Sequence, residues 1–128
     1  MARIIYVEDD TIVGDAVQKI LTQAGHLVGV IAHGTLGYDT IAFKKPDLVI
    51  LDRKLPGMQG LEILRALRQL PQLYLTPVLM LSATGGEDAI DEAMGAGAND
   101  YLVKPFTPEE LVDRVAGVLR QNSFRKAE

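Results

Sequence analysis

Apolar residues in this chain fall into short continuous runs that are separated by longer stretches of mixed character. Four runs are apolar throughout, at residues 4–7, 48–51, 78–81 and 101–103, and a weaker fifth run covers residues 26–31. Short runs without polar alternation are typical of strands that are buried on both faces of a parallel sheet. The pattern therefore predicts five strands in the interior of the molecule.

The stretches between these runs show the period of amphipathic helices. After the first run, apolar residues recur at the spacing of one helix face until Gly25, which is expected to end that helix. A second apolar stripe is expected to end at Pro71. A third begins at Thr107, where Pro108 suits the first helical position and Glu110 completes a capping box.

Two less regular helices complete the pattern. One is interrupted by Gly34 and Gly37, and the other is short, at about residues 87–94. Strand and helix then alternate five times, which predicts an α/β fold with a doubly wound parallel sheet, five helices and right-handed crossovers. Residues 1–121 form the expected domain, and residues 122–128, where the helical period is lost, are expected to be a tail or the start of a linker.

Composition narrows the possible classes of protein. A chain of 128 residues that is 48% hydrophobic and 23% charged suits one domain with a proper core. A net charge of −4 argues against direct nucleic-acid binding, and the absence of cysteine excludes disulfides and thiolate sites. The apolar runs are too short for a membrane span and the acidic start is unlike a signal peptide, so we expect a cytoplasmic protein without membrane contact.

Reactive side chains follow four of the predicted strands. Glu8 and Asp9 come after the first strand, Asp52 after the third, Ser82 after the fourth and Lys104 after the fifth. In an open parallel sheet, ligands bind beyond the carboxyl ends of the strands, where the strand order reverses. We therefore expect these residues to form one pocket.

The residue types in this pocket favour phosphoryl chemistry. Two carboxylates about 4 Å apart repel by roughly 4 kcal/mol at an effective dielectric near 20, so a cation is expected among them. The hard oxygen ligands favour Mg²⁺ or Mn²⁺, with Glu8 and Asp9 as anchors. Asp52 is placed to attack a phosphoryl group and form an aspartyl phosphate, while Lys104 supplies positive charge and Ser82 a hydroxyl.

Five short motifs occur in order over residues 3 to about 121. They are Val7-Glu8-Asp9-Asp10, Asp52 with Leu55-Pro56-Gly57-Met58, Leu81-Ser82-Ala83, Gly97-Ala98-Asn99-Asp100-Tyr101, and Lys104-Pro105-Phe106. Together they resemble the receiver domain of two-component response regulators, of the chemotaxis-receiver type. The resemblance implies a flavodoxin-like sheet with the strand order 2-1-3-4-5.

The resemblance also implies a role for each site residue. The implied metal ligands are Glu8, Asp9, Asp52 and the backbone carbonyl of Lys54. The implied phosphoryl acceptor is Asp52, and Lys104 and Ser82 are implied to contact the phosphoryl group. The implied switch residues are Tyr101 and Ser82. A cis bond between Lys104 and Pro105 is implied as well. The chain is then no enzyme on other substrates, and catalyses only its own Mg-dependent phosphorylation and dephosphorylation.

Partners follow from the same resemblance. A sensor histidine kinase or a phosphotransfer protein would donate the phosphoryl group, and the face formed by the fourth helix, fifth strand and fifth helix would control an unknown output domain or protein. Asp100, Glu110 and Arg114 match residues that join homodimers of winged-helix regulators. The basic partner expected on the fourth helix is Ile90 here, which weighs against a symmetric dimer.

Three other interpretations stay open at this stage. A degenerate receiver would bind partners without phosphorylation, with Lys54 replacing the charge of the metal. A flavodoxin-like electron carrier would need a phosphate cradle, which Glu8, Asp9 and Asp10 would repel. An aspartyl phosphatase would carry a second acid two residues after the first, where this chain has Lys54.

Overall fold

Five strands and five helices alternate along the chain, as the hydrophobic pattern predicts. The computed structural model describes residues 1–127, with side chains through residue 122. The elements are β1 (Arg3–Val7), α1 (Thr11–Gln23), β2 (Leu27–Ile31), α2 (Gly34–Lys44), β3 (Leu48–Leu51), α3 (Gly60–Leu67), β4 (Val78–Ser82), α4 (Glu87–Gly95), β5 (Asp100–Val103) and α5 (Pro108–Ala127). Among the described residues, no helix is long and apolar enough to cross a membrane.

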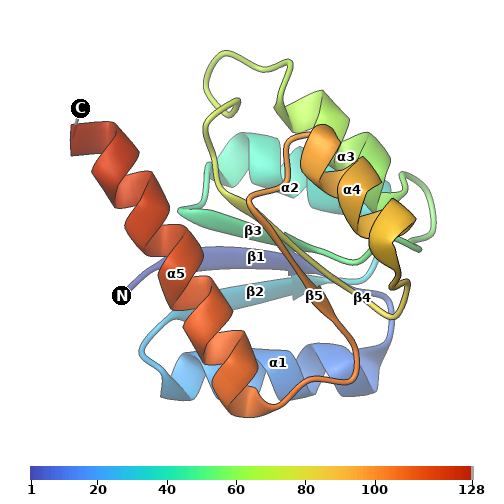
Figure 1. The fold of residues 1–128 in the computed structure, drawn as a ribbon, viewed down its shortest axis with the longest axis vertical. Coiled ribbons are helices and arrows are strands. Elements are labelled where there is room, and N and C mark those ends of the chain that lie inside the picture. Colours follow the sequence, from blue (N-terminus) through green and yellow to red (C-terminus); the bar gives the residue numbers. More distant parts are fainter. Residues whose placement is uncertain (128) are drawn as a thin grey trace.

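The strands form one parallel sheet in the order β2-β1-β3-β4-β5, which confirms the expected topology. The chain moves from β1 outward to β2 and then back across β1 to β3 (Figure 1). The strand order therefore reverses beside β1 and β3. The carboxyl ends of these two strands flank the point at which a ligand site is expected in such a sheet.

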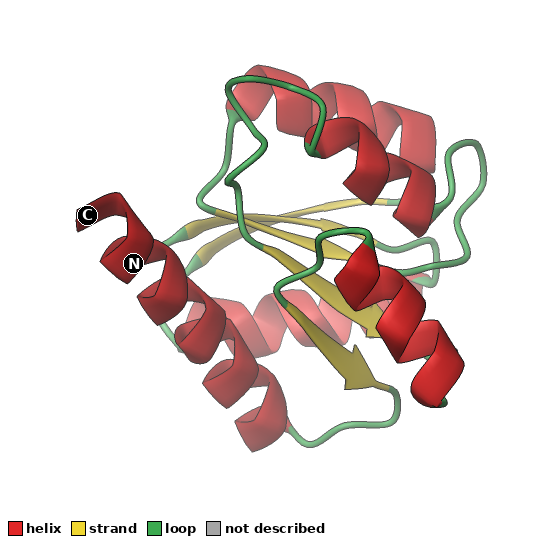
Figure 2. Cartoon of the chain, turned by 45° about the horizontal axis from the view of Figure 1, so that its top comes forward, coloured by secondary structure: helices red, strands yellow, loops and turns green. Residues whose placement is uncertain are grey.

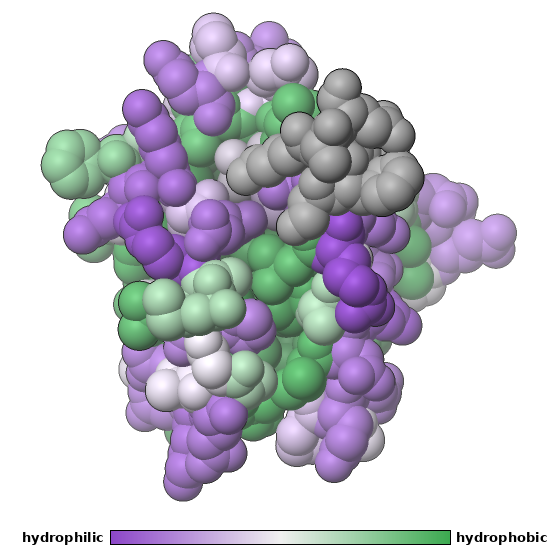
Figure 3. Space-filling model, turned by 90° about the vertical axis from the view of Figure 1, so that its left-hand side faces the viewer, coloured by the Kyte–Doolittle hydropathy of each residue, from purple (hydrophilic) through white to green (hydrophobic). Residues whose placement is uncertain are grey.

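Helices cover both faces of the sheet (Figure 2). One apolar cluster joins the sheet to α2, α3 and α4, and contains Ile41, Leu64 and Ala93. The other joins it to α1 and α5, through Leu21 and Val115. Every residue of β3 and β4 is buried, which explains why their sequences show no polar alternation. On the side that carries the chain ends, hydrophobic side chains form a band between hydrophilic margins (Figure 3).

The predicted helix ends are present. The side chain of Asp10 caps α1 by accepting from the N–H groups of Ile12 and Val13, at 2.9 and 3.2 Å. Gly25 follows α1 with a φ of 97°, a conformation that glycine adopts without strain. At the start of α5, Thr107 and Glu110 exchange two hydrogen bonds of 3.1 Å, which is the expected capping box.

The end of α3 differs from the prediction. Helix α3 stops at Leu67, and the chain reaches Pro71 through turns with i→i+3 bonds such as Leu70 N–H to Leu67 O. Proline disfavours helical backbone in the residue before it, so the helix loosens early. The backbone of α5 is helical through Ala127. A polar sequence is able to extend a helix beyond its apolar stripe. Glu128 lies outside the described residues, and the division after residue 121 stays a prediction.

Candidate functional site

The structure brings the reactive residues from four strand ends to one cavity. It has a volume of about 730 Å³ and is lined by Glu8, Asp9, Asp10, Asp52, Lys54, Ser82, Ala83, Thr84 and Lys104. The lining follows β1, β3, β4 and β5 at their carboxyl ends. The topology is sufficient to explain this convergence, because all five strands are parallel and their ends share one edge.

The carboxylates of Glu8, Asp9 and Asp52 form the acidic centre of the cavity. One oxygen from each lies within 4.8 Å of the others. Glu8 and Asp52 are buried, whereas Asp9 is exposed and opens the cluster to solvent. Three hard oxygen donors without sulfur or imidazole fit a magnesium-type cation, which keeps several waters in its coordination sphere.

Lys104 is the cation of this cluster. Its Nζ donates to Glu8 Oε1 at 2.5 Å and to Asp52 Oδ2 at 2.9 Å, and its side chain is 17% exposed. The cis peptide bond expected between Lys104 and Pro105 is present directly after β5. A largely buried ammonium between two carboxylates offsets part of the repulsion that the strand arrangement creates.

The two buried carboxyls have opposite pKa shifts. Burial raises the pKa of Glu8 above its usual value, and hydrogen bonds from Lys104 and Tyr6 oppose it only in part. Burial also acts on Asp52, but the hydrogen bonds with Lys104 and Glu8, together with the Lys104 charge, outweigh it and hold the pKa of Asp52 below its usual value. Burial would lower the pKa of Lys104, yet its two carboxylate partners raise it. Asp52 is therefore ionised at neutral pH, the form in which its oxygen is nucleophilic.

Tyr6 is a site residue that the sequence analysis missed. Its hydroxyl donates to Glu8 Oε1 at 2.7 Å inside the molecule. Burial and the acceptor Glu8 raise the pKa of Tyr6 well above its usual range. The signal was present in the sequence: a lone hydroxyl in an apolar strand, two residues before Glu8, lies on the same face of the strand.

Ser82 and Tyr101 are connected through a single residue of the loop after β4. The Thr84 N–H donates to Ser82 Oγ at 3.1 Å, and the Tyr101 hydroxyl donates to the Thr84 carbonyl at 2.5 Å. Both Ser82 and Tyr101 are buried. A displacement of Ser82 would therefore pull on the backbone group that holds the Tyr101 ring.

The loop after β3 shapes the other side of the cavity. The Arg53 N–H donates to Asp52 Oδ1 at 2.7 Å, and the Gly60 N–H donates to the Arg53 carbonyl at 2.8 Å. A Cβ at Gly60 would lie 2.0 Å from the Asp52 carbonyl oxygen, so only glycine permits this approach. Lys54 is exposed on this loop and lines the cavity.

The three predicted interface residues lie outside the cavity. Arg114 Nη1 is 3.4 Å from Asp100 Oδ1 and also donates to the Tyr101 carbonyl at 2.7 Å. Glu110 belongs to the capping box of α5. Asp100 and Arg114 are thus paired within one chain, and Ile90 is half-buried on α4.

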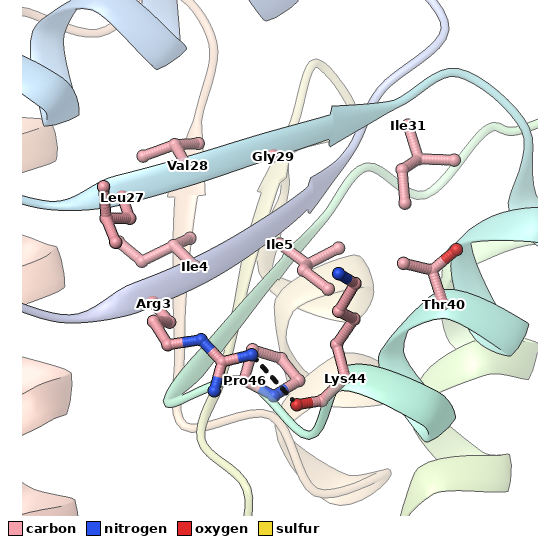
Figure 4. A pocket seen from close by; sticks show the side chains of 10 residues that line it. All are labelled: Arg3, Ile4, Ile5, Leu27, Val28, Gly29, Ile31, Thr40, Lys44 and Pro46. Carbon is pink, nitrogen blue, oxygen red and sulfur yellow. Dashed lines mark hydrogen bonds between the residues drawn. The ribbon is translucent and has the colours of Figure 1, made fainter.

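A second cavity lies away from these residues, between the β1–β2 edge and α2 (Figure 4). Its volume is about 350 Å³, and its lining includes Ile5, Ile31, Thr40 and Lys44. Arg3 donates to the carbonyl of Lys44 at its rim, at 3.2 Å. The lining contains no carboxylate, so this cavity offers neither metal-binding acids nor a carboxylate acceptor for a phosphoryl group.

The sequence of this chain is similar to those of known proteins. A family model described as response regulator receiver domain matches residues 4–116. The DNA-binding response regulator MtrA of Mycobacterium tuberculosis is 39% identical over 128 residues, covering 98% of this chain and 54% of that protein. The phosphate regulon transcriptional regulatory protein PhoB of Rhizobium meliloti is 37% identical over 121 residues, covering 94% and 53%. This chain thus spans about half the length of these relatives.

Solved structures agree with this match. The BeF3-activated N-terminal receiver domain of Klebsiella pneumoniae RstA is 34% identical with a TM-score of 0.85, covering 92% of this chain and 98% of that chain. The chemotaxis protein CheY4 of Vibrio cholerae is 32% identical with a TM-score of 0.86 and the same coverage. The matched family model spans nearly the whole chain, and the strand order and acidic pocket accord with it. The chain therefore belongs to the response regulator receiver domain family.

Proposed function

We propose that this receiver domain takes a phosphoryl group onto Asp52 from the phosphohistidine of a sensor histidine kinase or a phosphotransfer protein. The observation that carries the proposal is the ionised Asp52 carboxylate. Its Oδ2 accepts a hydrogen bond from Lys104 Nζ at 2.9 Å. The carboxylate also lies in one cluster with those of Glu8 and Asp9, at the carboxyl-terminal edge of the sheet. An oxygen nucleophile beside fixed positive charge and metal-binding oxygens is what phosphoryl transfer requires.

The transfer step is a displacement at phosphorus. An Asp52 oxygen forms the new P–O bond while the P–N bond to the donor histidine breaks, and the electron pair of that bond returns to the imidazole nitrogen. Glu8, Asp9, Asp52 and the backbone carbonyl of Lys54 would hold Mg²⁺ or Mn²⁺. When bound, the cation offsets the charge on the phosphoryl oxygens. Lys104 turns its ammonium to these oxygens, and the Ser82 hydroxyl donates to one of them.

The same pocket releases the group to water. Attack of water on phosphorus breaks the P–O bond and regenerates the Asp52 carboxylate, with inorganic phosphate as product. Both reactions change the protein itself, so the domain acts as a switch and not as an enzyme on a separate substrate.

Phosphorylation would act on the α4–β5–α5 face. The added group carries a charge of about −1.5 to −2, which draws Ser82 and Lys104 toward it. Because Thr84 joins Ser82 to Tyr101, this movement changes the environment of the Tyr101 ring on β5. The domain then shifts an existing equilibrium between two conformations. An output domain or partner protein would respond to this face.

We also propose that phosphorylation promotes a homodimer through this face. Asp100 and Arg114 pair within the chain, and would be available to a second copy only by exchanging partners. Sedimentation of the protein with and without beryllofluoride measures this directly. A monomer in both states would remove the dimer from the proposal and leave the phosphoacceptor role intact.

The test of the proposed function is formation of an adduct at Asp52. We expect acetyl phosphate to add one phosphoryl group by intact mass, and beryllofluoride to give a bound fluorine NMR signal, both only with Mg²⁺. The Asp52→Asn variant, of the same shape without the charge, should give neither. An unsubstituted protein that forms no adduct would instead be a receiver that acts without phosphorylation.

A further inference from the structure

We propose that Arg53 is a positioning residue that fastens the Asp52 carboxylate to α4, so that a change of state at Asp52 reaches α4 directly. The inference rests on the proposed function. It concerns a route separate from the one through Ser82, Thr84 and Tyr101.

The backbone of Arg53 is fixed on the Asp52 side. Its N–H donates to Asp52 Oδ1 at 2.7 Å, while its carbonyl accepts from the Gly60 N–H at 2.8 Å. These two hydrogen bonds are made by the two peptide groups on either side of the Arg53 Cα. The position of the Arg53 Cα therefore depends on the Asp52 side chain on one side and on the first residue of α3 on the other.

The side chain of Arg53 is fixed on the α4 side. Nη1 donates to the Ala89 carbonyl at 3.0 Å and Nη2 donates to Glu92 Oε1 at 2.5 Å. The side chain is only 16% exposed. A planar guanidinium that binds a carbonyl and a carboxylate of the same helix fixes both the distance and the orientation of that helix.

Helix α4 has little else to hold it. Of its nine residues, all described, only Ala93 is fully buried, and Ile90 is half-buried against the core. Helix α3, of eight residues, buries five. Since apolar burial is the main source of helix attachment, the polar contacts of Arg53 are a large share of what positions α4.

Phosphorylation of Asp52 would alter the first bond of this chain of contacts. A carboxylate oxygen is now the acceptor for the Arg53 N–H. After phosphoryl transfer, one oxygen of Asp52 bridges to phosphorus in the acyl phosphate and the other is a neutral carbonyl oxygen. Charge-assisted hydrogen bonds are roughly twice as strong as neutral ones, so the Arg53 peptide is held less tightly whichever oxygen accepts. This weakening reaches α4 through the Arg53 side chain.

The experiment compares three variants by amide NMR with Mg²⁺ and beryllofluoride. Arg53→Ala removes both contacts to α4 and keeps the N–H that faces Asp52. Glu92→Gln removes the charge of one contact. Arg65→Ala is the matched control, because Arg65 Nη2 lies 3.9 Å from the other oxygen of Glu92 and is 56% exposed, without a described contact to the Asp52 loop. Fluorine NMR measures how much of each protein carries the adduct.

We expect beryllofluoride to shift the α4 amides in the unsubstituted protein and in Arg65→Ala. The α4 shifts at equal adduct occupancy should fall by at least about half in Arg53→Ala, less in Glu92→Gln. The shifts at Tyr101 should persist, which a general loss of structure would not allow. Full α4 shifts in Arg53→Ala would overturn this inference alone, whereas an unsubstituted protein without any adduct would overturn the proposed function and this inference with it.

Discussion

Lys104 and its carboxylate partners define the charge of the site. When all three are ionised, Glu8, Asp9 and Asp52 contribute three negative charges within one cluster, and the Lys104 ammonium neutralises one of them. The two that remain match the charge of a single divalent cation. Burial of Glu8 and Asp52 strengthens this match, because uncompensated charge is costly where water is excluded.

Lys54 introduces an additional cation at the rim of this cavity. Its ammonium repels a dication, by up to about 1 kcal/mol at roughly 10 Å in a water-like dielectric. We therefore expect Lys54→Asn to bind Mg²⁺ about threefold more tightly and to change the rate of dephosphorylation, since the long side chain no longer shields the phosphoryl group. NMR titration with Mg²⁺ measures the affinity, and loss of the adduct over time measures the rate.

Lys19→Asn is the control for this experiment. Lys19 is exposed on α1, outside the cavity lining, and its replacement changes the net charge by the same amount. Equal Mg²⁺ affinity and dephosphorylation rates in Lys54→Asn and the unsubstituted protein would contradict the expectation.

His26 makes stability depend on pH at a point far from the acidic cavity. Its Nδ1 accepts from the Ala2 N–H at 3.2 Å. Burial, and then the nearby N-terminal ammonium, lower the pKa of His26 below its usual value. The unfolded chain thus binds a proton at a higher pH than the folded chain does, so this contribution to stability is present above about pH 6.5 and is lost as the pH falls through the folded pKa.

Replacement of His26 by glutamine tests this linkage. Glutamine keeps an acceptor for the Ala2 N–H but does not titrate. Urea unfolding at about pH 7.5 and about pH 5.5 should show a smaller loss of stability in His26→Gln than in the unsubstituted protein. Other groups, including the buried Glu8, titrate in both proteins, so the difference between the two losses is the relevant quantity. Equal losses would rule out the role of His26.

Among the elements, α3 connects the core to the site. It begins at Gly60, whose missing side chain lets the helix start against the Asp52 carbonyl. The same helix buries Ile63, Leu64 and Leu67 in the apolar cluster. A change at its first residue therefore affects both the packing of the core and the placement of Asp52.

Gly60→Ala should be strongly destabilising. The added Cβ would lie 2.0 Å from backbone, so the helix start or the end of β3 must move. We expect a loss of more than about 2 kcal/mol in unfolding free energy and a slower reaction with acetyl phosphate. Gly95→Ala, in α4, is the matched variant: nothing lies within 4 Å of its Cβ, and helix propensity should stabilise it by up to about 1 kcal/mol. Similar unfolding free energies for the two variants would contradict the steric explanation.

Several elements show why local sequence was informative to different degrees. Asp10, Gly25 and the Thr107–Glu110 box act within a few residues of themselves, and all were predictable. The end of α3 could not be predicted in this way. Leu70 continues the apolar stripe of the helix, but the stripe does not reveal that the backbone before Pro71 has already left the α-helical conformation.

The acidic cluster that we propose as the metal site exists only in the folded molecule. Asp52 is far from Glu8 and Asp9 in the chain, and only the folded sheet brings the three carboxylates within 4.8 Å. A cation that binds the folded state alone must stabilise it by mass action. Mg²⁺ at ten times its dissociation constant should add about 1.4 kcal/mol, which is several degrees in melting temperature for a domain of this size.

Asp9→Asn should remove most of this stabilisation by Mg²⁺. Asp9 is exposed, so the substitution itself costs little folding energy. Asp39→Asn changes an exposed acid on α2 and should keep the full response. Thermal unfolding followed by circular dichroism, over a series of Mg²⁺ concentrations, gives the comparison. A melting temperature that is insensitive to Mg²⁺ in the unsubstituted protein would contradict the metal site.

The sequence alone determined the order of strands and helices along the chain and the residues that follow each strand. It also predicted that those residues meet at the carboxyl-terminal edge of the sheet. These features depend on periodicity and on the parallel geometry of the sheet, both of which can be read along the chain. Tertiary structure alone decided that Lys104 lies between Glu8 and Asp52 and that Arg53 reaches α4. Each of these contacts depends on side-chain direction and on distances across the fold, which no local pattern specifies.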